Sequence, residues 1–177
     1  MKKTSGGFSL IELLIVVAII LIIAAIAIPD LLKSRQAANQ ASAVGSLRTM
    51  NTSEVTYSST YTLGFSYSLL ALDGPSGGLA TADAAGLIDS ILGGGIKSTY
   101  GFSYSANPAS PSTAVACANP PTQNSVAASV NVTAYSITAS PILCVAGNGN
   151  YYFTDQSGVI RMNNGQVATS TDNPLAG

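Results

Sequence analysis

Residues 8–29 read FSLIELLIVVAIILIIAAIAIP, an almost unbroken apolar run that ends in a proline. From residue 8 to residue 28 the run holds a single charged residue, Glu12, and a helix of about 20 apolar residues is long enough to cross a bilayer. Gly6 and Gly7 stand in front of the run, whereas an ordinary secretory signal places its small residues after the apolar core. The stretch therefore predicts a membrane-spanning helix rather than a standard cleaved signal.

The charges that flank the run predict its orientation. Lys2 and Lys3 precede it, and Asp30 follows it. Basic residues are enriched on the cytoplasmic side of a membrane span, so the N-terminus is expected in the cytoplasm. Everything after Ile28 is then expected outside the cytoplasmic membrane.

Glu12 is the anomaly within the apolar run. A carboxylate near the centre of a bilayer costs roughly 2.5 to 3.5 kcal/mol on insertion scales, and less near an edge. One interpretation places Glu12 at the cytoplasmic interface, where its side chain snorkels into water. The other gives it a positive partner, because a cut after Gly7 would free an amine at Phe8, four residues before Glu12. Two parallel helices staggered by about one turn could then pair amine and carboxylate, and the pair would set the register between neighbouring copies.

Residues 1–29 resemble the type IV prepilins and the related pseudopilins. The matching features are a short basic leader that ends in a pair of glycines, the string FSLIELL that begins at Phe8, and an apolar run that ends at Pro29. The resemblance implies cleavage between Gly7 and Phe8 by a prepilin peptidase, followed by N-methylation of the Phe8 amine. It also implies that Phe8, Glu12 and Pro29 serve assembly, and that a soluble head follows an extended helical stem.

One helix is predicted from about Phe8 to Tyr57 or a little beyond, roughly 75 Å at 1.5 Å per residue. Pro29 lacks a backbone donor, and it is expected either to kink or locally melt this helix or to end its membrane segment. Beyond the proline, apolar residues recur mostly at three or four positions, the spacing of an amphipathic helix that lies against a globular domain. The predicted apolar face comprises Leu31, Leu32, Ala37, Ala38, Ala41, Val44, Leu47 and Met50.

After Gly64 the sequence changes to short elements and turns. A helix is predicted over Thr81–Leu92, with Thr81 as its N-cap. Strands are predicted over Tyr100–Ser105 and Val126–Ile137, and a hairpin over 151–162. We infer an antiparallel sheet of three to five strands that packs on the second half of the long helix, and we expect the last dozen residues to fray.

The predicted fold class is therefore α+β, with a long N-terminal α-helix and a C-terminal antiparallel β-sheet head. The predicted organisation is a cleaved leader at 1–7, a membrane and filament-core helix at 8–28, the amphipathic half of the same helix at 29–63, and a head at 64–177. Within the head, a loop region at 64–98 precedes the sheet at 99–165.

The composition argues against most enzymes. The 177 residues are 47% hydrophobic and only 8% charged, and they include no His and no Trp. Without His, serine and cysteine nucleophiles lack their commonest general base and zinc lacks its commonest nitrogen ligand. Asp155 and Asp172 are the only acidic residues after Asp89, which is poor for calcium. The net charge of −1 offers no basic surface for nucleic acid. We predict no enzyme activity, no cofactor and no metal site.

Cys117 and Cys144 are the two cysteines. Export of the head would place both in an oxidising compartment, where a disulfide is the default. A Cys117–Cys144 disulfide is the expected arrangement, and two free buried thiols are the alternative. Many pilins similarly carry a disulfide near the C-terminus, although the bridge expected here would end at Cys144, well before the last residue, Gly177.

The resemblance implies a structural subunit of a type IV pilus that supports adhesion, motility or uptake. The alternatives are a pseudopilin of a type II secretion system and a minor pilin, which use the same N-terminal helix. The implied partners are other copies of the chain, minor pilins, the prepilin peptidase, an inner-membrane assembly platform and the membrane before assembly. The implied location is a single-pass inner-membrane protein with a periplasmic head, and an extracellular pilus afterwards.

Overall fold

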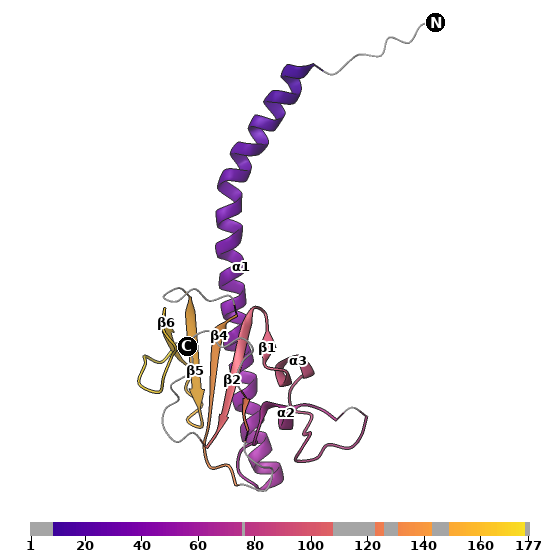
Figure 1. Ribbon diagram of the computed structural model, residues 1–177, viewed down its shortest axis with the longest axis vertical. Helices are drawn as coiled ribbons and strands as arrows, with labels where there is room; N and C mark the ends of the chain where they lie inside the picture. The colour runs from indigo at the N-terminus through magenta and orange to yellow at the C-terminus, as the bar shows by residue number, and fades with distance from the viewer. Residues whose placement is uncertain (1–8, 76, 108–122, 126–130, 143–148, 176–177) are drawn as a thin grey trace, which may run out of the picture. The chain divides into compact units, whose positions relative to one another are not determined.

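The computed structural model describes residues 9–75, 77–107, 123–125, 131–142 and 149–175. Its longest element is helix α1, Leu10–Tyr61 (Figure 1). This confirms the prediction of one long N-terminal helix over the part of the predicted range that the structure describes. Pro29 lies inside α1, and the helix continues through it, so the chain does not melt there.

The chain divides into two units, Met1–Ala38 and Asn39–Gly177, and each is described by itself. The buried face of α1 begins only in the second unit, at Ala43. Leu31 and Leu32 are exposed, so the predicted apolar face is buried in this single chain only over its last part. The buried residues of α1 are Ala43, Val44, Ser46, Leu47, Met50, Ser53, Glu54 and Tyr57.

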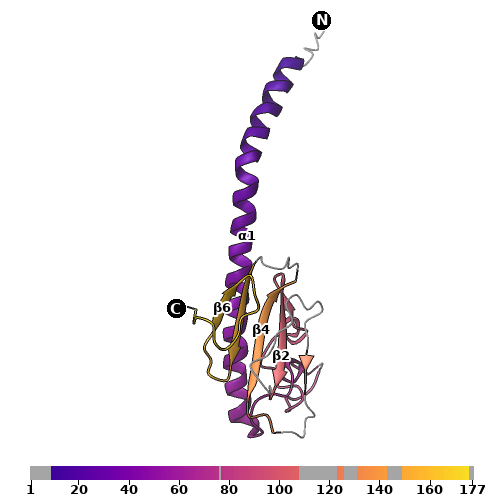
Figure 2. The same ribbon diagram turned by 60° about the vertical axis from the view of Figure 1, so that its left-hand side comes forward.

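The second unit is an antiparallel sheet packed against the 39–61 part of α1, as Figure 2 shows. The strand order is β1-β2-β4-β5-β6, and the short strand β3 pairs in parallel with β2. The predicted α+β fold with up to five antiparallel strands is thereby confirmed. The strands are β1 (Ile96–Lys97), β2 (Tyr100–Ala106), β3 (Gln123–Asn124), β4 (Tyr135–Pro141), β5 (Asn150–Asp155) and β6 (Arg161–Asn164).

Side chains from one face of the sheet form the core with α1. Phe102 and Ile137 are fully buried, as are Leu47 and Met50 on the helix. Burial of one such side chain contributes roughly 1.5–3 kcal/mol, so this face determines where the sheet lies on the helix. Alternate residues of a strand point to opposite faces, which is why the aromatic residues of β2 recur at every second position.

The predicted helix over Thr81–Leu92 is wrong. Two short helices are found instead, α2 (Leu69–Leu72) and α3 (Ser90–Gly93), and Asp89 rather than Thr81 is the N-cap of α3. The backbone amides of residues 85–88 donate to carbonyls of residues 71–73, so they are not free to form helical hydrogen bonds. Tertiary backbone pairing thus overrides the local helical pattern.

The strand predicted over Val126–Ile137 is displaced. β4 begins at Tyr135 and ends at Pro141, and residues 126–130 lie outside the described part of the chain. The side chain of Asn107 explains the late start: its Oδ1 accepts from the amides of Thr133 at 2.8 Å and Ala134 at 3.2 Å. These amides are therefore not available to a neighbouring strand.

The predicted hairpin is confirmed. β5 and β6 pair in antiparallel register with Phe153 opposite Arg161, around a turn in which Gly158 has a positive φ of 72°. The expected fraying of the C-terminus is wrong for the described residues up to 175. Ala168 is fully buried against Tyr151 and Phe153, so the tail covers the outer face of β5.

The end of α1 requires a glycine. Gly64 follows the helix with a φ of +85°, a conformation that side chains other than glycine rarely adopt. A Cβ at this position would lie 2.3 Å from the carbonyl oxygen of Val132. The amide of Phe65 donates to the same carbonyl at 2.9 Å, so this close approach ties the end of the helix to the segment before β4.

Asn51 joins the helix to the sheet through polar contacts. Its amide nitrogen lies 2.8 Å from Thr154 Oγ1 on β5, and its Oδ1 accepts from the hydroxyl of Tyr135 on β4 at 3.1 Å. Tyr135 and Thr154 are both buried. A single helix side chain thereby holds two strands, and we call these contacts the Asn51 latch.

The substitution Asn51→Ala is expected to lower the free energy of unfolding by about 1–3 kcal/mol, because it leaves buried hydroxyl groups without a partner. Thermal or urea melts of the full-length protein in detergent measure the change. Thr52→Ala is the matched control, since the exposed Thr52 hydroxyl donates to the Arg48 carbonyl of its own helix. Equal stability of the two variants would contradict the latch.

Candidate assembly site

The first part of α1 presents an apolar surface on all sides. The large apolar side chains from Leu10 to Ile28 are exposed in the first unit, with Leu10 at 79% and Ile26 at 67% of full exposure. Within the described residues, α1 is the one helix long and apolar enough to cross a membrane. Such a surface is stable only in lipid or against other apolar helices, so it is the candidate site of membrane anchoring and assembly.

Glu12 lies in the first turn of this helix and is exposed. The backbone amide of Ser9 donates to Glu12 Oε2 at 3.0 Å. This is one half of a capping box, in which the third helical residue reaches back to the N-cap. The negative charge also lies at the positive end of the helix dipole. The sequence prediction missed this local partner, although the S-x-x-E spacing of a capping box is visible at residues 9–12.

The remaining predicted site residues are divided between described and undescribed parts of the chain. Pro29 is exposed on α1, far along the helix from Glu12. The predicted cleavage and methylation residues, and both predicted disulfide cysteines, lie outside the described residues. Those residues are Gly6, Gly7, Phe8, Cys117 and Cys144.

A buried carboxylate in the head was missed from the sequence. Glu54 is fully buried on α1. Its Oε2 accepts from the amide of Ser66 at 2.8 Å, and its Oε1 accepts from the Ser66 hydroxyl at 2.6 Å. The hydroxyl of Tyr104 on β2 donates to the Ser66 carbonyl. A usable signal was present, because Glu54 falls on the helical face that carries Leu47 and Met50.

The environment of Glu54 changes its protonation. Burial raises the pKa of the Glu54 carboxyl above its ordinary value of 4.5, and the hydrogen bonds from Ser66 and Tyr104 offset part of that rise. The same burial raises the pKa of the Tyr104 hydroxyl, with the Glu54 charge as a further cause. The hydrogen bonds among Glu54, Ser66 and Tyr104 hold the segment after α1 against the helix and the sheet.

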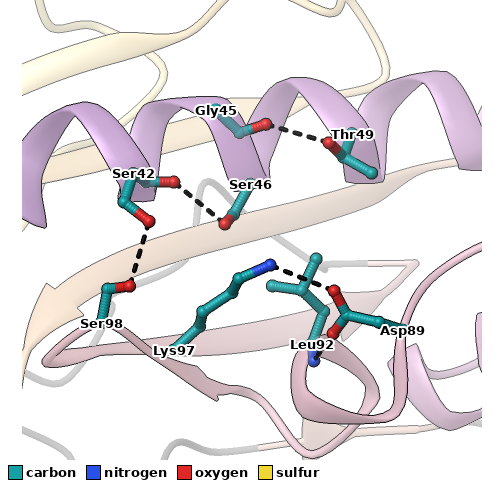
Figure 3. A network of polar contacts seen from close by, with 8 residues as sticks. All are labelled: Ser42, Gly45, Ser46, Thr49, Asp89, Leu92, Lys97 and Ser98. Carbon is teal, nitrogen blue, oxygen red and sulfur yellow. Dashed lines mark hydrogen bonds and ion pairs between the residues drawn. The ribbon is translucent and has the colours of Figure 1, made fainter.

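Polar contacts also stabilise α3 and the loop after β1. Asp89 Oδ1 accepts from the amide of Leu92 at 2.8 Å, which caps α3, and Asp89 Oδ2 pairs with Lys97 Nζ at 3.1 Å (Figure 3). The backbone amide of Leu92 is the largest cause of the lowered pKa of the Asp89 carboxyl. Ser42 donates to the Ser98 hydroxyl at 3.1 Å, joining the loop after β1 to α1.

An open groove of about 430 Å³ lies on the head, and its lining combines the Arg48 side chain and hydroxyl groups with a larger share of apolar surface. The Thr49, Thr52 and Thr56 hydroxyls donate to helix carbonyls four residues earlier. In the described ranges no group of three or more metal-ligating side chains gathers. The lining residues are Arg48, Thr49, Thr52, Ser53, Thr56 and Leu87.

The N-terminal segment matches a known family model, described as the prokaryotic N-terminal methylation motif, over residues 2–28. The match covers most of the leader, the predicted cleavage position and the apolar part of α1 with Glu12. No curated protein matches the chain. No solved structure matches it.

Glu54 is expected to make stability fall as the pH rises. Below the ordinary pKa of 4.5 both the folded and unfolded states carry a neutral carboxyl, whereas above the raised pKa the folded state must hold a buried charge. The melting temperature of the wild type minus that of Glu54→Gln should therefore decrease as the pH passes upward through this window. The full-length protein in detergent is used for both series.

Taking this difference removes the contribution of Asp89, whose lowered pKa has the opposite effect and destabilises the fold at low pH. A difference that stays constant from pH 4 to pH 8, or that grows with pH, would show that Glu54 does not titrate in this way.

Proposed function

We propose that the chain, which belongs to the type IV pilin and pseudopilin superfamily, is the structural subunit of a type IV pilus. The N-methylation motif, the long helix with its apolar first part and the antiparallel sheet establish that membership. Members of this superfamily are structural proteins and not enzymes. They are processed by a prepilin peptidase and they polymerise.

The observation that carries the proposal is the overlap of two features in one segment. The methylation motif at 2–28 covers the exposed apolar surface of α1, which begins at Leu10. A subunit anchored by this helix can leave the bilayer at little cost if identical helices replace the lipid, because both surroundings are apolar. The filament core would then consist of the first part of α1 from many copies.

Glu12 supplies direction to that assembly. Cleavage after Gly7 would leave a positive amine at Phe8, and the carboxylate of a neighbouring copy is its natural partner in an apolar core. The capping contact engages Glu12 Oε2, and in the described part of the chain no hydrogen bond to Oε1 is found. One carboxylate can therefore cap its own helix with one oxygen and bind the amine of the next copy with the other.

The proposed location follows from the flanking charges. The N-terminus lies in the cytoplasm and the head in the periplasm before assembly, with the peptidase and an inner-membrane platform as partners. Minor pilins are further proposed partners of the filament. A Cys117–Cys144 disulfide is proposed in the exported head, where oxidising conditions favour it. A pseudopilin or minor pilin would use the same segment, and filament abundance distinguishes these roles.

Mechanical shearing of cells, followed by intact-mass analysis of the sheared and membrane fractions, tests the proposal. A pilus subunit is expected to be abundant in the sheared fraction. Its mass should correspond to a chain that begins at N-methylated Phe8 and is two hydrogens light for the disulfide. The same processed species found only in membranes would indicate a pseudopilin or minor pilin instead. An unprocessed N-terminus in both fractions would contradict membership of a processed filament.

The substitutions Glu12→Gln and Glu12→Ala separate capping from charge pairing. The amide oxygen in E12Q can still accept from the Ser9 amide, so the cap is kept while the charge is lost. If the charge directs assembly, both variants should reduce sheared filaments by at least about tenfold, since a lost buried pair costs more than about 1.4 kcal/mol. Wild-type filament yield from E12Q would show that Glu12 acts only as a cap. Intact mass of the membrane fraction checks that processing is unchanged.

A further inference from the structure

We infer that the protonation of Glu54 controls the segment 62–67, which stays attached to α1 and β2 while the carboxyl is protonated and detaches when the proton is lost. The sheet stays folded in both states. The head therefore opens locally as the pH rises. The inference concerns the second unit by itself and does not depend on the proposed function.

The contacts around Ser66 accommodate a proton on Glu54. Ser66 Oγ lies within hydrogen-bond distance of Glu54 Oε1 at 2.6 Å, the Ser68 carbonyl at 3.1 Å and the Tyr104 hydroxyl at 3.1 Å. Its hydroxyl has one hydrogen, and Tyr104 donates its own to the Ser66 carbonyl. An ionised Glu54 takes the Ser66 hydrogen and leaves none for Ser68. A protonated Glu54 donates to Ser66, whose hydrogen then serves Ser68, so the acid supplies the hydrogen that these oxygens lack.

The surroundings of Glu54 contain no charge that would stabilise a carboxylate. Glu54 is fully buried, and among the described residues the titratable groups that act on it from the packed elements are tyrosines. Burial raises the pKa of each of these hydroxyls, so they stay neutral in the range where a carboxyl titrates. The carboxylates that also act on them, Asp83 and Asp155, supply no positive charge. The three tyrosines are Tyr57 on α1, Tyr104 on β2 and Tyr135 on β4.

The hydrogen bonds that tie segment 62–67 to α1 and β2 centre on Ser66. Its amide and hydroxyl bond to Glu54, and its carbonyl bonds to Tyr104. Thr62 and Leu63 are exposed, and the amide of Phe65 bonds to the segment before β4. A buried charge without a charged partner is strongly unfavourable, so an ionised Glu54 gains free energy by reaching water. Detachment at Ser66 opens that route.

The backbone of the segment favours detachment as well. Thr62 has a φ of +55°, and a β-branched residue rarely adopts this conformation. Gly64, two residues later, also has a positive φ. Strained backbone of this kind persists only while surrounding contacts hold it. Release of the segment therefore relieves strain at Thr62, immediately after the end of α1.

The sheet is held to α1 by contacts that do not include this segment. The Asn51 latch joins α1 to β4 and β5. Leu47 and Met50 of α1 lie in the same buried core as Phe102 and Ile137 of the sheet. Local opening requires less free energy than unfolding of the whole head, so detachment of one segment is the easier route by which Glu54 ionises.

Hydrogen exchange of the full-length protein in detergent tests the inference. Exchange of the 62–67 amides is measured for the wild type and Glu54→Gln at several pH values from 4 to 8, and the ratio of the two rates cancels the intrinsic effect of pH. The side chain in E54Q has a donor and an acceptor, as the protonated acid has, but it does not ionise. The ratio of wild type to E54Q is expected to rise by at least about tenfold, because each pH unit shifts the opening equilibrium about tenfold where only the open state is ionised.

The amides of β4 report on the rest of the head in the same samples. They are expected to stay protected from pH 4 to pH 8. Loss of protection by the same factor in β4 and in 62–67 would show that the whole head unfolds, and would overturn local release. A ratio for 62–67 that stays constant or falls as the pH rises would overturn control by Glu54.

Tyr104→Phe is the matched control, because it removes the bond to the Ser66 carbonyl and keeps the Glu54 carboxyl. It is expected to speed exchange of 62–67 about fivefold at every pH, the effect of one lost hydrogen bond, and to leave the rise with pH in place. Disappearance of the rise in Y104F would mean that Glu54 alone does not control the segment, and would overturn the inference.

Discussion

The whole architecture depends on how one apolar helical surface is covered. The large apolar side chains of α1 from Leu10 to Ile28 are exposed in the single chain. Exposure of these side chains to water is unfavourable, because hydrating so much apolar area costs free energy. Lipid and the same surface of other copies are both suitable, and the exchange of one for the other costs little. The direction of the exchange then depends on the few polar groups present, of which Glu12 is the only charged one in the run.

The head uses polar contacts differently. Its core is apolar and aromatic, but two helix side chains form hydrogen bonds there. Asn51 bonds to β4 and β5. Glu54 bonds to the segment after α1, to which β2 also forms a hydrogen bond. A buried polar group that loses its hydrogen bond destabilises the fold by more than the bond itself contributes. These contacts therefore fix where the sheet lies along the helix. The second part of α1 thus serves the head, whereas the first part remains available to lipid or to other copies.

The sequence predicts best what is determined locally. A membrane-length apolar run and a β-hairpin with Asp155 and Gly158 in its turn are both set by residues close together in the chain. The failures have distant causes. The segment 81–92 follows a helical pattern, but the amides of residues 85–88 are taken by carbonyls at the end of α2. The start of β4 depends on the side chain of Asn107, which lies far earlier in the chain, at the end of β2. Helical periodicity puts Glu54 on the face that carries Leu47 and Met50, but it does not reveal Ser66, the distant partner that compensates its burial through hydrogen bonds.

We propose that α1 helices pack in parallel in the filament core with the amine of one copy on the carboxylate of the next. Electron cryomicroscopy with helical reconstruction of sheared filaments measures this most directly. The N-terminal helices are expected to be in contact along the axis, and the Phe8 nitrogen is expected within hydrogen-bond distance of Glu12 of an adjacent copy. Filaments held together by their heads, with the Leu10–Ile28 segments separated from one another, would contradict it.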